Sequence, residues 1–85
     1  MEIKVLGPGC RKCETLAKEV YKALERLKIP ADVKKITDVN EIAGHNILMT
    51  PGLIINGKIK SAGKVPKPQQ IEKWIQEEVP LSIRF

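Results

Sequence analysis

Residues 3–28 read IKVLGPGCRKCETLAKEVYKALERLK, and this stretch decides the fold. Its apolar start, Ile3–Leu6, predicts a short buried strand that runs into the turn-forming residues 7–9. Over Arg11–Lys28 the apolar side chains recur every three or four residues, which predicts an amphipathic helix that Pro30 ends. A buried strand that leads through a tight loop into such a helix is the first half of a strand–helix–strand unit.

The second half of that unit is a predicted strand over Ala31–Ile36. The pair Lys34-Lys35 interrupts its apolar alternation, and such an interruption is typical of a strand at the edge of a sheet. Because the chain reaches this strand through a helix, the two strands should be parallel and joined by a right-handed crossover. Asp38 and Glu41 then resemble a capping box that opens a short helix ending at Gly44.

The C-terminal half contains the strongest local signal, an Asn-Gly pair between two strand-like runs. Asn56-Gly57 separates Leu53–Ile55 from Lys58–Ala62, and this pattern predicts a β-hairpin with a type I′ turn. A last helix is expected to begin at Pro68 and to end before Pro80. Its apolar residues recur at helical spacing and comprise Ile71, Trp74, Ile75 and Val79.

The order of these elements is strand, helix, strand, short helix, hairpin and helix. It predicts an α/β fold in which a four-stranded mixed sheet is flanked by helices on both faces. The chain has 85 residues and no internal repeat or low-complexity segment, so residues 1–85 are expected to form a single domain.

The charge pattern argues against nucleic acid as a partner. The formal net charge is +5, but acidic residues are interleaved with the basic ones, and one Trp, one Tyr and one Phe leave little for base stacking.

No stretch approaches the roughly 20 apolar residues of a membrane helix, and the N-terminus does not resemble a secretory leader. We therefore expect a cytoplasmic monomer. The densest basic stretch is expected to be a solvated face and comprises Lys58, Lys60, Lys64 and Lys67.

Cys10 and Cys13 are the two cysteines of the chain, and their spacing calls for a chemical explanation. A disulfide between them would close too small a loop to constrain the unfolded chain. Cys10 falls where the loop meets the helix and is expected to be exposed, while Cys13 lies one turn further in and is expected to be partly buried. The first-turn N–H groups and the helix dipole favour a thiolate there, so one thiol can attack a disulfide and the other can resolve the product.

Arg11 and Lys12 break a local rule, because cations in the first turn of a helix oppose its dipole. We hypothesise that they help to hold Cys10 as a thiolate. The alternative is that both side chains are merely exposed and screened by solvent.

Two other classes of function compete with the redox interpretation. Zinc needs four ligands, and the two thiols with His45, the only histidine, leave the set short; His45 is expected to be a surface or packing residue. Copper-type metal chaperones also place Cys-x-x-Cys after a first strand, but they carry a methionine where Pro8 stands and end on a strand. A non-catalytic interaction module would bind a partner tightly without either thiol. We expect neither a bound metal nor a cofactor.

Four groups of residues together resemble those of a known family: Cys10–Cys13, Met49-Thr50-Pro51, Asn56-Gly57 and Gly63–Pro66. They look like the small thioredoxin-like, or glutaredoxin-like, redox-active disulfide proteins of archaea and some bacteria. The resemblance spans nearly the whole chain and implies a thioredoxin fold, thiol–disulfide oxidoreductase activity and disulfide-containing protein substrates. It also implies that Pro51 is cis and packs beside the dithiol, and that the backbone at Thr50 pairs with an extended segment of the substrate.

Departures from better-known relatives bear on the reductant. Thioredoxins proper place a Trp before a Cys-Gly-Pro-Cys motif, whereas Gly9 precedes Cys10 here and Trp74 is expected to be a core anchor of the last helix. Typical glutaredoxins carry Cys-Pro-Tyr-Cys and a Gly-Gly after the hairpin that help to bind glutathione, and neither occurs here. We therefore expect an electron donor of the thioredoxin-reductase type rather than glutathione.

Overall fold

The computed structural model describes residues 1–47 and 49–79, and the tail that follows lies outside the described residues. Seven elements follow one another in the order that the sequence predicts. They are β1 (Glu2–Leu6), α1 (Arg11–Leu27), β2 (Asp32–Ile36), α2 (Val39–Gly44), β3 (Gly52–Ile55), β4 (Lys58–Ala62) and α3 (Pro68–Glu77).

The four strands form one mixed sheet in the order β2-β1-β3-β4. β1 pairs in parallel with β2 and antiparallel with β3, and β4 closes the hairpin on β3. β2 therefore lies at an edge, as its lysine pair predicts. Asn56 and Gly57 both have positive φ, at 50° and 80°, which a type I′ turn requires. The predicted four-stranded α/β fold is confirmed.

The two helix boundaries of α1 depend on different residues. Cys10 is the N-cap, and at the other end Lys28 adopts a left-handed conformation with φ 55°. Its N–H reaches the carbonyl of Glu25, and the next N–H, that of Ile29, reaches Leu24, so the last carbonyls are satisfied without a glycine. Lys28 is thus the cap of the helix and not its last residue, which places the end one residue before the predicted one.

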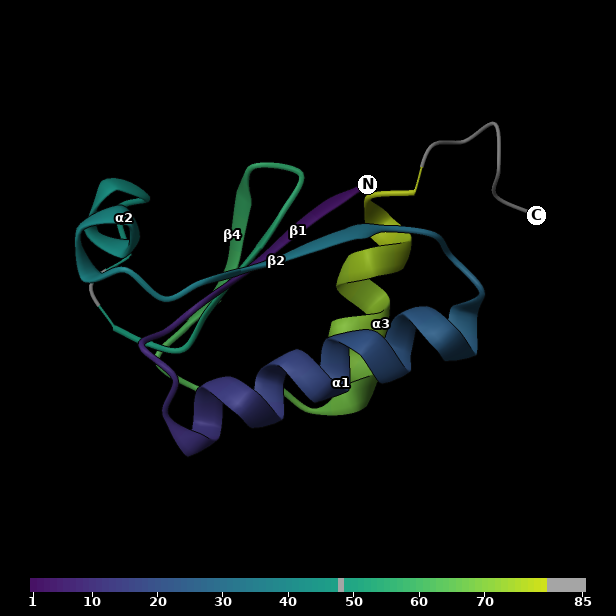
Figure 1. Cartoon of the computed structure of the whole chain (residues 1–85). Coiled ribbons are helices and arrows are strands. Elements are labelled where there is room, and N and C mark those ends of the chain that lie inside the picture. The colour runs from purple at the N-terminus through teal and green to yellow at the C-terminus, as the bar shows by residue number, and fades with distance from the viewer. Residues whose placement is uncertain (48, 80–85) are drawn as a thin grey trace.

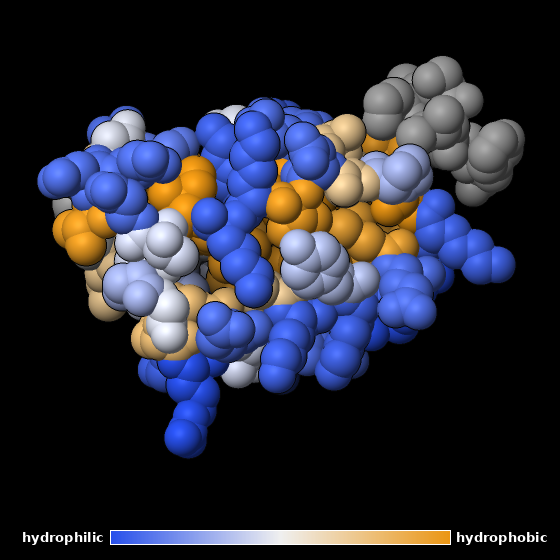
Figure 2. Space-filling model, in the orientation of Figure 1, coloured by the Kyte–Doolittle hydropathy of each residue, from blue (hydrophilic) through white to orange (hydrophobic). Residues whose placement is uncertain are grey.

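Helices cover the two faces of the sheet unequally. α1 and α3 pack together on one face, while α2 stands at the end of the sheet where β1 and β2 finish (Figure 1). In the same orientation, Figure 2 shows apolar patches that reach the surface between hydrophilic side chains. The main core lies under α1 and α3 and comprises Ile3, Val5, Leu16, Ala17, Val20, Ala23, Leu24, Leu53, Ile55, Ile71 and Ile75. The smaller cluster under α2 comprises Leu6, Ile36, Ile42, Ile47 and Ile54.

Trp74 does not have the role that the sequence predicts for it. Ile71 and Ile75 are fully buried and anchor α3, whereas Trp74 is half-buried and packs against the margin of the same core. The helical spacing is correct, but the α1 surface beneath α3 is lined by small and aliphatic side chains, and the two isoleucines fill it.

The basic stretch is also not one solvated face. Lys58 and Lys60 donate to the carboxylate of Glu78, at 3.2 and 3.1 Å, and these ion pairs hold the hairpin to the end of α3. The bond from Lys60, followed by that from Lys58, lowers the pKa of Glu78 below its usual value of 4.5. Lys64 and Lys67 are exposed and lie beyond this cluster along the chain. None of the helices in the described ranges is long and apolar enough to cross a membrane.

Candidate active site

Cys10 caps the helix that follows it. Its backbone is extended, with φ −73° and ψ 166°, and its carbonyl accepts the N–H of Glu14 at 3.0 Å. Its Sγ atom accepts the N–H of Cys13 at 3.3 Å, in the place where Ser or Asp usually supplies an oxygen. The side chain is exposed. A sulfur atom that receives a peptide N–H and faces solvent has the environment of a nucleophile.

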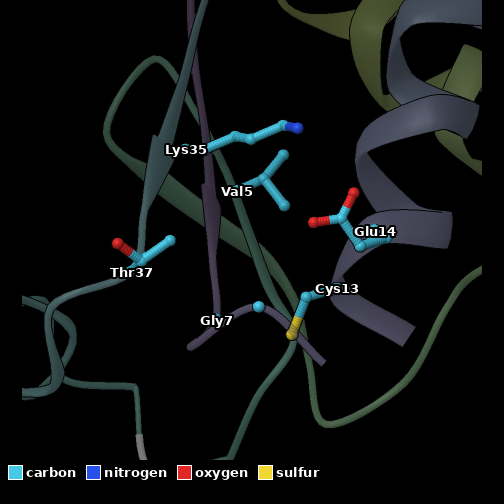
Figure 3. Close-up of a pocket in the computed structure, with 7 residues that line it drawn as sticks. Val5, Gly7, Cys13, Glu14, Lys35 and Thr37 are labelled. Atoms are coloured by element: carbon cyan, nitrogen blue, oxygen red, sulfur yellow. The ribbon is translucent and has the colours of Figure 1, made fainter. Parts of the chain in front are cut away.

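Cys13 lies on the buried side of the same helical turn. It is 6% exposed, and its Sγ atom points toward Gly7 at the end of β1 (Figure 3). A Cβ atom on Gly7 would overlap this sulfur and would lie 2.9 Å from the Cβ of Cys13 and 3.9 Å from the Cα of Pro51. Because glycine has no side chain, the Cys13 thiol can lie against the sheet at Gly7, next to Pro51.

The surroundings of the two thiols shift their pKa values in opposite directions. Hydrogen bonds from the Cys13 thiol, then from the N–H of Cys13, lower the pKa of Cys10 below its usual value of 9.0. Burial, followed by the hydrogen bond to Cys10, raises the pKa of Cys13. Both thiols are free in this structure. The exposed sulfur is thus the one that ionises first, and the buried one keeps its proton longer.

Arg11 and Lys12 are exposed on the first turn of α1. The carbonyl of Arg11 accepts the hydroxyl of Thr15 at 3.0 Å, and the N–H of Lys12 is one of the peptide groups that lower the pKa of Cys10. The two residues contribute to the site through their backbone.

The loop before β3 brings Thr50 and Pro51 to the dithiol. The Thr50–Pro51 peptide bond is cis, Pro51 is buried and Thr50 is half-buried. The carbonyl of Pro51 accepts the N–H of Gly63 at 2.9 Å, so the loop after β4 lies against the loop before β3. Met49 packs on the same glycine and leaves 64% of its surface exposed. Residues about forty positions apart in the sequence thus meet at one end of the sheet.

A small pocket opens beside Cys13, between the first turn of α1 and the ends of β1 and β2 (Figure 3). The carboxylate of Glu14 points into it from α1, and the ammonium group of Lys35 reaches toward it from β2. The sequence pattern did not point to these two residues or to Gly7 as parts of the site. Glu14 fits an exposed helix position where it could pair with Lys18 four residues later, Lys35 fits an exposed position on an edge strand, and Gly7 fits a turn. No local sequence signal distinguishes a site residue from these ordinary roles. The pocket is lined by Val5, Gly7, Gly9, Cys13, Glu14, Lys35 and Thr37.

His45 lies apart from the thiols. Its Nδ1 atom is 2.7 Å from the carbonyl of Glu41, and its Nε2 atom is 3.2 Å from the ammonium group of Lys4, a contact in which lysine is the donor. Within residues 1–47 and 49–79, no three His, Cys, Asp or Glu side chains gather as metal ligands would. The imidazole is engaged in packing α2 onto the sheet end.

Comparisons with known proteins agree with this geometry. A family model described as a thioredoxin domain matches residues 1–76. The chain is 41% identical over 74 residues to a thioredoxin of Methanocaldococcus jannaschii, covering 87% of this chain and 85% of that protein. It is 33% identical over 73 residues to a thioredoxin of Methanothermobacter thermautotrophicus, covering 86% of this chain and 95% of that one.

Proposed function

Since this chain belongs to the thioredoxin-domain family and is a thiol–disulfide oxidoreductase, we propose that Cys10 is its attacking thiolate and Cys13 its resolving thiol. The observation that carries these roles is the asymmetry of the pair. Cys10 is exposed and has a lowered pKa, whereas Cys13 is buried, has a raised pKa and touches Cys10 from one helical turn away.

The reaction proceeds in two exchanges. The Cys10 thiolate attacks one sulfur of a substrate disulfide, forms a mixed disulfide and releases the other substrate sulfur as a thiolate. Cys13 then loses its proton and attacks the Cys10 sulfur, which releases the second substrate thiolate and leaves the Cys10–Cys13 bridge. Two electrons pass from the dithiol to the substrate, and a separate reductant returns them.

Thr50 and Pro51 are proposed to hold the substrate beside the dithiol. Pro51 lies within van der Waals distance of the position that a Gly7 side chain would occupy, and that position also touches Cys13. An extended substrate segment laid along Thr50 would place its disulfide near Cys10. Backbone pairing of this kind gives affinity without demanding a particular substrate sequence.

The electron donor is proposed to be a thioredoxin reductase, and the working form a cytoplasmic monomer that folds as a single domain. The chain has Gly63-Lys64 after the hairpin, where typical glutaredoxins have a Gly-Gly pair that helps to bind glutathione. The absence of that pair is the reason to favour a protein reductant over glutathione.

Catalysed reduction of insulin tests the function. With dithiothreitol as the electron source, the protein should precipitate the insulin B chain well ahead of a protein-free control, and Cys10→Ser should return the rate to that control. Reduction supported by NADPH with a thioredoxin reductase, and not by glutathione, would identify the donor class. Wild-type protein that fails to exceed the control would contradict the oxidoreductase roles of both cysteines.

The pH dependence of alkylation tests the ionisation of Cys10 and the contribution of its neighbours. Because the pKa of Cys10 is lowered, its reaction with iodoacetamide should reach half of its maximal rate below pH 9.0, and Cys13 should react far more slowly.

If the cationic side chains stabilise the thiolate, Arg11→Gln with Lys12→Gln should slow alkylation at pH 7 roughly two- to five-fold. The matched control is Lys18→Gln with Lys22→Gln on the same helix, and an equal effect of both pairs would refute the proposed role.

A further inference from the structure

Several cations near the dithiol have no acidic partner among the described residues, and three of them lie on the two segments that carry Cys10 and Gly63. The ion pairs of this part of the chain engage Lys4, Lys22, Arg26, Lys58 and Lys60. Arg11, Lys12 and Lys64 are exposed, and no described carboxylate lies within 4.0 Å of their charged nitrogens. We call these three residues the basic rim.

The basic rim approaches Cys10 from two sides. Arg11 and Lys12 follow it directly on α1, while Lys64 arrives from the loop between β4 and α3. That loop is tied to the site because Gly63 donates its N–H to the carbonyl of Pro51 at 2.9 Å. Pro51 in turn lies beside Gly7 and Cys13, so the segments that carry these cations meet at the dithiol, although more than fifty residues separate Lys12 from Lys64 in the sequence.

Two carboxylates at this end of the sheet form no ion pair with the basic rim. Glu14 points into the pocket beside Cys13, on the side of Lys35 (Figure 3). Asp38 caps α2 and accepts the N–H groups of Asn40 and Glu41 through one oxygen, at 2.8 and 3.2 Å. A Cys10 thiolate contributes one negative charge against the three positive charges of the basic rim.

Met49 adds an apolar contact to the same surface. It packs on Gly63 and exposes 64% of its surface, next to the loop that carries Pro51. An exposed methionine adapts to differently shaped apolar side chains, and the cations around it discriminate by charge. Such a surface fits an extended protein segment that combines apolar and acidic residues.

We propose that the basic rim makes this protein prefer disulfides whose cysteine is flanked by Asp or Glu. The preference rests on the proposed function and deepens it, because it names the substrate class that the same site takes. It acts on the encounter between Cys10 and the substrate, since charges at the margin of a surface change association rates most.

Peptides with an activated disulfide test the preference. Each peptide carries one cysteine joined to thiopyridine, a neutral leaving group, and two Glu, two Ser or two Lys residues on each side. The reduced protein releases thiopyridone, which is followed by absorbance in a stopped-flow instrument. At about 0.1 M ionic strength we expect the Glu peptide to react roughly two- to five-fold faster than the Lys peptide. At about 1 M, where screening acts within about 3 Å, the ratio should approach one.

Charge reversal locates the effect, and the ratio of the two peptides cancels any change in the intrinsic reactivity of Cys10. Lys64→Glu should lower the ratio, whereas Lys22→Glu should leave it unchanged. Both substitutions change the net charge equally, but Lys22 lies twelve residues along α1, about 18 Å from Cys10 and nearly two screening lengths away. Equal rates for the Glu and Lys peptides with wild-type protein, or equal effects of the two variants, would overturn the proposal. No release from any peptide would instead overturn the proposed role of Cys10.

Discussion

Cys13→Ser is expected to accumulate a covalent complex with its substrate, whereas Cys10→Ser is expected to accumulate none. In the first variant the exposed Cys10 thiolate still attacks, but no second sulfur is present to displace the product, so the mixed disulfide persists. In the second variant the remaining thiol is buried and has a raised pKa, and both properties suppress its attack on a protein disulfide. Non-reducing electrophoresis and mass spectrometry would identify the adduct, which dithiothreitol should remove.

The two serine variants control for each other, because each removes one sulfur from the same helical turn. Comparable thermal unfolding temperatures would show that both remain folded. Trapping by Cys10→Ser and not by Cys13→Ser would reverse the assigned roles, and adducts with neither variant would refute a mixed-disulfide mechanism at this site.

Gly7→Ala is expected to disable the site and to destabilise the fold. The added methyl group would overlap the Cys13 sulfur and come within 2.9 Å of its Cβ, so α1 or the end of β1 must shift. Overpacking of this kind typically costs about 1–3 kcal/mol in the free energy of unfolding. If this shift displaces the resolving thiol by about an ångström, insulin reduction should fall roughly ten- to a hundred-fold.

Gly44→Ala is the matched control for this substitution. Gly44 is the last residue of α2, and a Cβ atom there would meet no heavy atom within 4 Å. The same chemical change should therefore leave insulin reduction intact and keep or slightly raise the unfolding temperature. If Gly7→Ala behaved like Gly44→Ala in both measurements, the close packing of Cys13 against β1 would not matter for function.

Much of the site was predictable because its signals are local. The order of strand, loop and helix places Cys10 at an N-cap and Cys13 one turn later, and backbone geometry alone then gives one exposed and one buried sulfur. Asn56-Gly57 specifies its turn by the positive φ that both residues adopt easily. The resemblance to a known family contributed Thr50 and Pro51, whose approach to Cys13 no local pattern encodes.

The remainder depends on contacts between distant segments. A turn glycine and a glycine that makes room for a sulfur look identical in sequence, so the role of Gly7 emerges only when α1 packs on β1. Lys58 and Lys60 look like solvated charges until the end of α3 brings Glu78 to them. Trp74 has the right helical phase for the core, yet Ile71 and Ile75 fill the available space.

The sequence by itself determined the elements, their order, the mixed sheet and the chemical identity of the dithiol, because periodicity, caps and turns act over a few residues. Only the tertiary structure decided which loop lies beside Cys13, which lysines remain without acidic partners and which glycine leaves room for the buried thiol. Those outcomes depend on distances between segments that lie tens of residues apart, and such distances are set when the sheet and its helices pack.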